Sequence, residues 1–168
     1  RSGDNDGGHP FLSPLAVKGD KVHRCLKGKT VVPKKKIENL ADIDLLSGLK
    51  PAELEKIEKS VSFRRYSDHE QIIDRQSETS DVFFIVDGDI RVVNYSLSGR
   101  EITLDELSGG DYFGELAAID GRSRSASVMA LTDSLVASLP KGQFLALLGS
   151  HPTIAMKVIR RLTEIVRT

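Results

Sequence analysis

The sequence has little of what several classes of protein require. Its 168 residues include a single cysteine, Cys25, which cannot form a disulfide within the chain. The four histidines are scattered and do not have the spacing of a zinc site or a cupin-type metal centre, and one cysteine is too few for a redox or haem sensor. No apolar run approaches the roughly 18 residues of a membrane-spanning helix, and the N-terminus lacks the apolar stretch of a signal peptide. We therefore expect a cytoplasmic protein with no membrane segment, no metal site and no catalytic cofactor.

The length and 39% hydrophobic content allow one domain with a real core plus an appendage. Residues 1–36 carry nine basic and three acidic side chains, while the remaining chain carries 15 basic and 21 acidic ones. Five glycines and three prolines without periodicity predict that 1–36 is a flexible basic arm or linker. Phe11 is its only aromatic residue, which disfavours a base-stacking nucleic-acid surface, so we do not expect direct DNA binding. Because the chain begins with Arg1, we expect a fragment or a processed form.

The hydrophobic periodicity predicts a second unit, 37–168, that is mainly β with flanking helices. Helical spacing over 37–61 predicts two short N-terminal helices, the first ending at Gly48 and the second opening at Pro51. From 62 to 139 the period changes to two, and short strands separated by Gly and Asp turns predict a β roll or jelly roll. Over 140–168 the spacing predicts a pair of C-terminal helices. The wide apolar face of the last helix fits packing on the roll or a homodimer, and both alternatives stay open.

One segment, 109–128, interrupts the strand pattern with a helical turn. Gly114 would let the backbone approach a ligand, and the turn that begins at Glu115 would present free N–H groups to an anion. Arg124 follows nine residues after Glu115. A buried arginine needs an anionic partner and a buried carboxylate needs donors, so a phosphate and a sugar hydroxyl would satisfy the two, as in a nucleotide. The alternative is that Glu115 and Arg124 simply pair with each other.

This segment closely resembles the phosphate-binding cassette of the cyclic nucleotide-binding domain family. The family pattern runs Phe-Gly-Glu-Leu-Ala, a short gap, then Arg and small residues, and it occurs here at Phe113–Ala117 and Arg124–Val128. The stretches "LLSGLKPAELEKI", "DVFFIVDGDIRVV" and "HPTIAMKVIRRLTEIV" also fall in the family's order. The resemblance therefore covers 37–168, a module of the catabolite activator and protein kinase A regulatory type. The bacterial catabolite activator ligand domain looks especially close, without a gap from Glu101 to Glu115.

The resemblance implies a role for each matched residue. Glu115 would accept the ribose 2′-hydroxyl, and Arg124 would hold the exocyclic phosphate oxygens with support from the amides of Ala117 and Ala126. The ligand-binding positions implied in this way are Phe113, Gly114, Glu115, Leu116, Ala117, Arg124, Ser125 and Ala126. Val92, Leu104 and Leu107 are candidate base-facing positions, although core packing explains them equally well. Ser125 leaves the base open, and we favour cyclic AMP over cyclic GMP as the ligand.

Two departures from the family pattern affect this interpretation. Ser123 stands where a proline commonly precedes the arginine, so the loop is expected to be less rigid. In the catabolite activator relative, the residues that cap the adenine lie just past the position of Thr168, so Arg160 or Arg161 would have to approach the base instead. A solvated helix face is the alternative role for both arginines.

The function that the resemblance implies is regulatory rather than enzymatic. A cyclic nucleotide would bind the cassette, and the C-terminal helix would repack to control an attached or partner effector. The effector is left open, because channels, kinase regulators, cyclases and transcription factors all use this module. The alternative is a degenerate copy of the domain that binds no ligand and serves as a structural or protein-interaction module.

Overall fold

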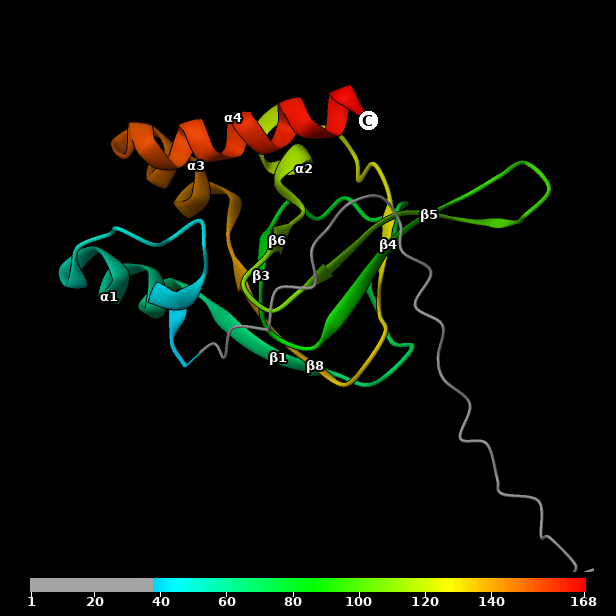
Figure 1. Cartoon of the computed structure of the whole chain (residues 1–168), viewed down its shortest axis with the longest axis horizontal. Helices are drawn as coiled ribbons and strands as arrows, with labels where there is room; N and C mark the ends of the chain where they lie inside the picture. The colour runs from blue at the N-terminus through cyan, green and yellow to red at the C-terminus, as the bar shows by residue number, and fades with distance from the viewer. Residues whose placement is uncertain (1–37) are drawn as a thin grey trace, which may run out of the picture. The chain divides into compact units, whose positions relative to one another are not determined.

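A computed structural model describes residues 38–168, so the predicted basic arm lies outside the described residues. The described part forms two antiparallel four-stranded sheets, ordered β1-β8-β3-β6 and β2-β7-β4-β5, with helices before and after them (Figure 1). The predicted fold class, mainly β with flanking helices, is confirmed. The elements are η1 (Leu40–Asp42), α1 (Pro51–Ser60), β1 (Ser62–Tyr66), β2 (Gln71–Ile73), β3 (Val82–Asp87), β4 (Asp89–Tyr95), β5 (Glu101–Ser108), β6 (Tyr112–Phe113), α2 (Glu115–Asp120), β7 (Ser127–Ala130), β8 (Ser134–Leu139), α3 (Lys141–Ser150) and α4 (Pro152–Arg167). None of the helices within residues 38–168 is long and apolar enough to cross a membrane.

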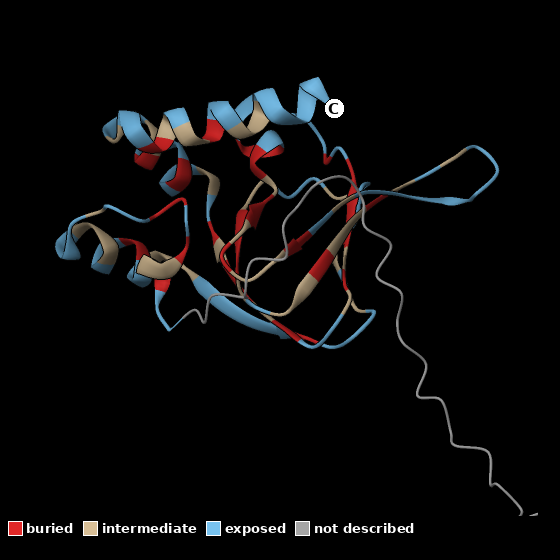
Figure 2. Cartoon of the chain, viewed as in Figure 1, coloured by how far each residue is buried: buried red, intermediate tan, exposed pale blue. Residues whose placement is uncertain are grey.

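Strand β3 divides the hydrophobic core into two parts. Successive side chains of a strand point to opposite faces, so Phe83 and Ile85 enter one cluster while Val82 and Phe84 enter the other. The first cluster lies between the two sheets, and the second joins the outer face of β3 to the helices. Figure 2 shows buried residues on the strands, α2 and α3, and a largely exposed α4.

The helix predicted over 37–48 is wrong. Over the described residues 38–48, the chain forms the 3₁₀ turn η1 and then a separate turn over 44–48, because Asn39 accepts a hydrogen bond from the Ala41 amide and Ile43 has an extended backbone with ψ 125°. Such local side-chain bonds to the backbone compete with a regular helix. The carbonyls of Asp44 and Ser47 are instead bonded by the ammonium of Lys157, at 2.9 and 3.2 Å. The apolar spacing still predicted burial correctly, since Leu40, Ile43 and Leu46 are all in the core.

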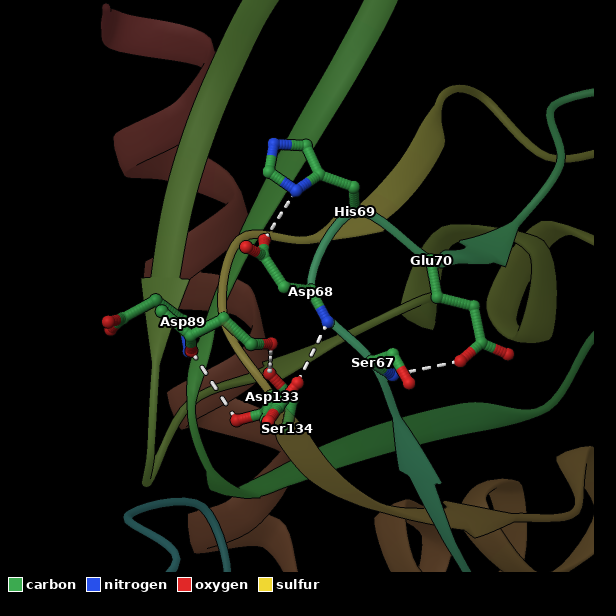
Figure 3. A network of polar contacts seen from close by, with 8 residues as sticks. Ser67, Asp68, His69, Glu70, Asp89, Asp133 and Ser134 are labelled. Carbon is green, nitrogen blue, oxygen red and sulfur yellow. Dashed lines mark hydrogen bonds and ion pairs between the residues drawn. The ribbon is translucent and has the colours of Figure 1, made fainter.

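A polar network joins the turn after β1 to the turn before β8 (Figure 3). The Asp68 amide donates to the carboxylate of Asp133 at 3.0 Å, and the Ser67 amide donates to Glu70 at 2.9 Å. His69 lies on this turn with φ 65°, and its Nδ1 is 2.7 Å from the Asp68 carboxylate. Within residues 38–168, no group of three His, Cys, Asp or Glu is placed to hold a metal ion. Because its hydrogen bonds join the turn after β1 to the turn before β8, we attribute a structural role to this network.

Candidate functional site

Between β6 and α2, the backbone of Gly114 lies unusually close to the side chain of Arg124. Gly114 precedes α2 with φ 85°, a left-handed conformation that side chains rarely adopt. A Cβ at Gly114 would lie 2.8 Å from Nη1 of Arg124, 2.9 Å from the Asp81 carbonyl and 3.3 Å from the Phe83 ring. Both the backbone conformation and the lack of space therefore require glycine at this position.

Arg124 is buried, with 4% of its surface exposed, and is held by uncharged acceptors. Its Nη1 donates to the Gly114 carbonyl at 2.9 Å, and its Nη2 donates to the Asp81 carbonyl at 2.9 Å. Nε and Nη2 also donate to the hydroxyl of Thr79, at 3.3 and 3.2 Å. The guanidinium carbon lies 5.6 Å from the centroid of the Phe83 ring, which stacks on Phe113 at 5.1 Å. Burial lowers the pKa of Arg124, but an arginine remains charged at neutral pH.

Glu115, the first residue of α2, is buried to a similar degree, with 6% exposed. Burial raises its pKa, and the positive charges of Arg161 and Arg124 oppose that rise. Among residues 38–168, no salt bridge joins Glu115 to Arg124. The alternative that these two side chains simply pair with each other is therefore wrong. A buried cation without an ion-paired carboxylate can attract an anion, and a buried carboxylate can accept a hydroxyl proton.

The C-terminal helix α4 reaches this site through Arg161. Its guanidinium carbon lies 4.4 Å from the centroid of the Tyr112 ring, a cation–π contact, while Arg160 is exposed. The predicted alternative of a solvated face therefore fits Arg160 and does not fit Arg161. Tyr112 is buried, which raises its pKa to about 12, while the nearby charge of Arg161 opposes that rise. Figure 1 shows α2 between the roll and the C-terminal helices, and α2 contacts α3.

Comparison with protein-family models decides the family. The model of the cyclic nucleotide-binding domain matches residues 63–151, which is more than half of the chain. This chain belongs to the cyclic nucleotide-binding domain family.

Similar proteins include regulators from both eukaryotes and bacteria. The chain is 38% identical over 115 residues to the cAMP-dependent protein kinase regulatory subunit of Mycosarcoma maydis, a match that covers 66% of this chain and 22% of that protein. The catabolite activator protein of Thermus thermophilus superposes with a TM-score of 0.65 and 28% identity, covering 73% of this chain and 58% of that one. A regulatory subunit of a cAMP-independent protein kinase A from Trypanosoma cruzi, bound to guanosine, has a TM-score of 0.65 and 26% identity, covering 76% and 44%. The chain thus spans only part of each relative.

The cyclic nucleotide-binding fold brings most of the predicted cassette together. Phe113, Ala117 and Ala126 are buried beside the two charged residues, whereas Ser125 is exposed and Leu116 is 40% exposed. The three candidate base-facing residues differ in how far they are buried. Leu107 is 5% exposed and lies in the cluster between the sheets, Val92 packs against that cluster, and Leu104 is 55% exposed. Leu107 therefore has a core-packing role.

Sequence reasoning missed the residues that hold Arg124. Thr79 and Asp81 lie 45 and 43 positions before it, in the loop between β2 and β3. Nothing in the local pattern of that loop marks them, and only the fold brings the loop under the guanidinium.

An apolar groove lined by Ile159, Leu162, Thr163, Val166 and Arg167 lies on α4 and contains no cassette residue. The homodimer through this helix stays a prediction.

Proposed function

We propose that this chain is a regulatory module that binds a 3′,5′-cyclic nucleotide, with cyclic AMP preferred to cyclic GMP. The observation that carries the proposal is the pair of buried charges, Glu115 and Arg124, which share a site without forming an ion pair. Arg124 would bind the exocyclic phosphate oxygens with the amides of Ala117 and Ala126, and Glu115 would accept the ribose 2′-hydroxyl. The curated relative whose name specifies dependence on cAMP supports the choice of base.

A phosphodiester satisfies this site better than an uncharged ligand. Charge-assisted hydrogen bonds to a phosphate contribute roughly 1.5–3 kcal/mol each, and a buried guanidinium without an anion forgoes that energy. The similarity to a regulatory subunit bound to guanosine makes a nucleoside the second candidate ligand. A nucleoside would use Glu115 and leave Arg124 without an anion, which is why we favour the cyclic nucleotide.

A thermal-shift comparison tests the ligand. We expect cyclic AMP at about a hundredfold excess over its dissociation constant to stabilise the protein by about 2.7 kcal/mol, roughly 5–10 °C in Tm. Cyclic GMP should give a smaller shift, and 2′-deoxy cyclic AMP should also bind more weakly because it lacks the hydroxyl assigned to Glu115. AMP and guanosine serve as controls. No shift with any compound would favour the ligand-free alternative, and a dominant shift with guanosine would favour the nucleoside.

We further propose that α4 repacks when the nucleotide binds and thereby controls an attached or partner effector. Only Ile154 and Val158 of this helix are buried, while Met156, Ile159, Ile165 and Val166 are at least 44% exposed. Arg161 links the helix to Tyr112, and its charge opposes the rise that burial causes in the pKa of Glu115, so a ligand at Glu115 would alter the surroundings of this arginine. The coupling between ligand and helix would be roughly 1–3 kcal/mol, which is typical of such switches.

Amide hydrogen exchange measures this repacking. With saturating cyclic AMP, we expect exchange in residues 152–167 to change severalfold, because local opening free energies shift by the coupling energy. Residues 62–66 of β1 provide an internal control, since that strand pairs with β8 and none of the hydrogen bonds described for Arg124 involves it. Unchanged exchange throughout α4 in a protein that binds cyclic AMP would contradict the repacking.

A further inference from the structure

We infer that Thr79, supported by Ser77, is the positioning residue that orients Arg124 toward the ligand. The inference rests on the proposed function, since it assigns a task to Arg124 in phosphate binding. Thr79 is exposed in the loop between β2 and β3, yet its hydroxyl is bonded to a guanidinium that is 4% exposed. An exposed loop residue thus determines how a buried cation is held.

The hydrogen bonds at Thr79 fix the direction of each donor. A threonine hydroxyl has one proton to donate and two lone pairs that accept. The lone pairs receive Nε and Nη2 of Arg124, at 3.3 and 3.2 Å, so the hydroxyl proton has to point elsewhere. The oxygen of Ser77 lies 2.8 Å away and takes that proton, and it also accepts the Thr79 amide at 3.2 Å. Ser77 therefore locks Thr79 in the rotamer that faces Arg124.

The remaining bonds leave one donor of Arg124 for a ligand. A guanidinium has five N–H groups, and four are used by Thr79 (twice), Asp81 and Gly114. The fifth, on Nη1, has no partner among the described residues. Because Thr79 occupies the edge formed by Nε and Nη2, it determines that Nη1 is the group presented to the phosphate.

The chemistry of the hydroxyl also preserves the charge of the site. Thr79 and the two carbonyls are uncharged, so their hydrogen bonds orient Arg124 without pairing its charge, while the carboxylates of Asp81 and Glu115 act on it through space. A carboxylate in the place of the hydroxyl would orient the guanidinium equally well, but it would also compete with the phosphate for the positive charge. A neutral acceptor is therefore the residue type that suits an anion-binding arginine.

Three variants and one control test this inference. We expect Thr79→Val, which removes the hydroxyl and keeps the branched shape, to weaken cyclic AMP binding about tenfold in calorimetry, the usual loss when a charged hydrogen bond is removed. Thr79→Ser should stay within about twofold of the wild type, and Ser77→Ala should give an intermediate loss. Thr103→Val, at an exposed threonine on β5, provides the matched control and should leave affinity unchanged.

A second readout needs no ligand. The Nε–H signal of Arg124 in nuclear magnetic resonance should exchange slowly with water in the free wild-type protein and in Thr79→Ser, and rapidly in Thr79→Val. Equal affinity and equal exchange in wild type and Thr79→Val would overturn the inference while leaving the proposed function intact. A wild-type protein that binds neither cyclic AMP nor cyclic GMP would overturn the proposed function, and the exchange rates would then decide by themselves whether Thr79 holds Arg124.

Discussion

Arg124→Ala should lower the affinity for cyclic AMP at least tenfold, and by up to a hundredfold or more, when binding is measured by calorimetry. The substitution removes the buried positive charge of the site and the donor that meets the phosphate. Each charge-assisted bond contributes roughly 1.5–3 kcal/mol, and 1.4 kcal/mol corresponds to a factor of ten in the dissociation constant. It also leaves the carbonyls of Gly114 and Asp81 without their donors, so we expect a moderate loss of thermal stability.

Two further variants separate charge from geometry. Arg122 is exposed two residues before Arg124, so Arg122→Ala changes the net charge equally and should leave affinity within about twofold. Arg124→Lys keeps the charge but loses the planar group that spans Thr79, Asp81 and Gly114, so its affinity should fall close to that of the alanine variant. Wild-type affinity in Arg124→Ala would refute the role assigned to this residue.

Gly114→Ala should damage both stability and binding. The left-handed backbone at φ 85° costs about 1–2 kcal/mol for any residue with a Cβ. The new carbon would also lie 2.8 Å from Nη1 of Arg124 and 2.9 Å from the Asp81 carbonyl, so one of them has to move. We expect a total loss of about 3 kcal/mol in the free energy of unfolding and more than a tenfold loss of affinity, from denaturant unfolding and calorimetry respectively.

Gly121, at the other end of α2, is the matched control. It has a similar φ of 70°, but a Cβ there would meet only the Nζ of Lys141, at 3.5 Å. Gly121→Ala should therefore show the conformational cost of about 1–2 kcal/mol and no loss of affinity. If both variants lost the same stability and neither lost affinity, the close approach at Gly114 would have no role in the site.

The β region was predictable because short apolar runs separated by Gly and Asp turns indicate strands. The apolar run 82–86 predicts a strand, and the structure places β3 between two cores, which explains why residues on both of its faces are buried. The cassette was also visible, because its two segments are contiguous in the chain. The prediction of a regular helix over 37–48 was wrong because one or two helical turns contribute little stability. The bond that Asn39 accepts from the Ala41 amide and the bond that Lys157 donates to the Asp44 carbonyl outweigh that gain.

The amino-acid sequence by itself determined the fold class, the positions of Glu115 and Arg124 and the family of the chain. The period of the apolar residues and a short contiguous motif carry that information without reference to any distant residue. Only the tertiary structure decided that Arg124 bonds to Thr79 and Asp81 rather than to Glu115, and that Arg161 packs on Tyr112. Such pairings depend on loops and helices that lie more than 40 residues apart, and the charges alone would have fitted a direct ion pair equally well.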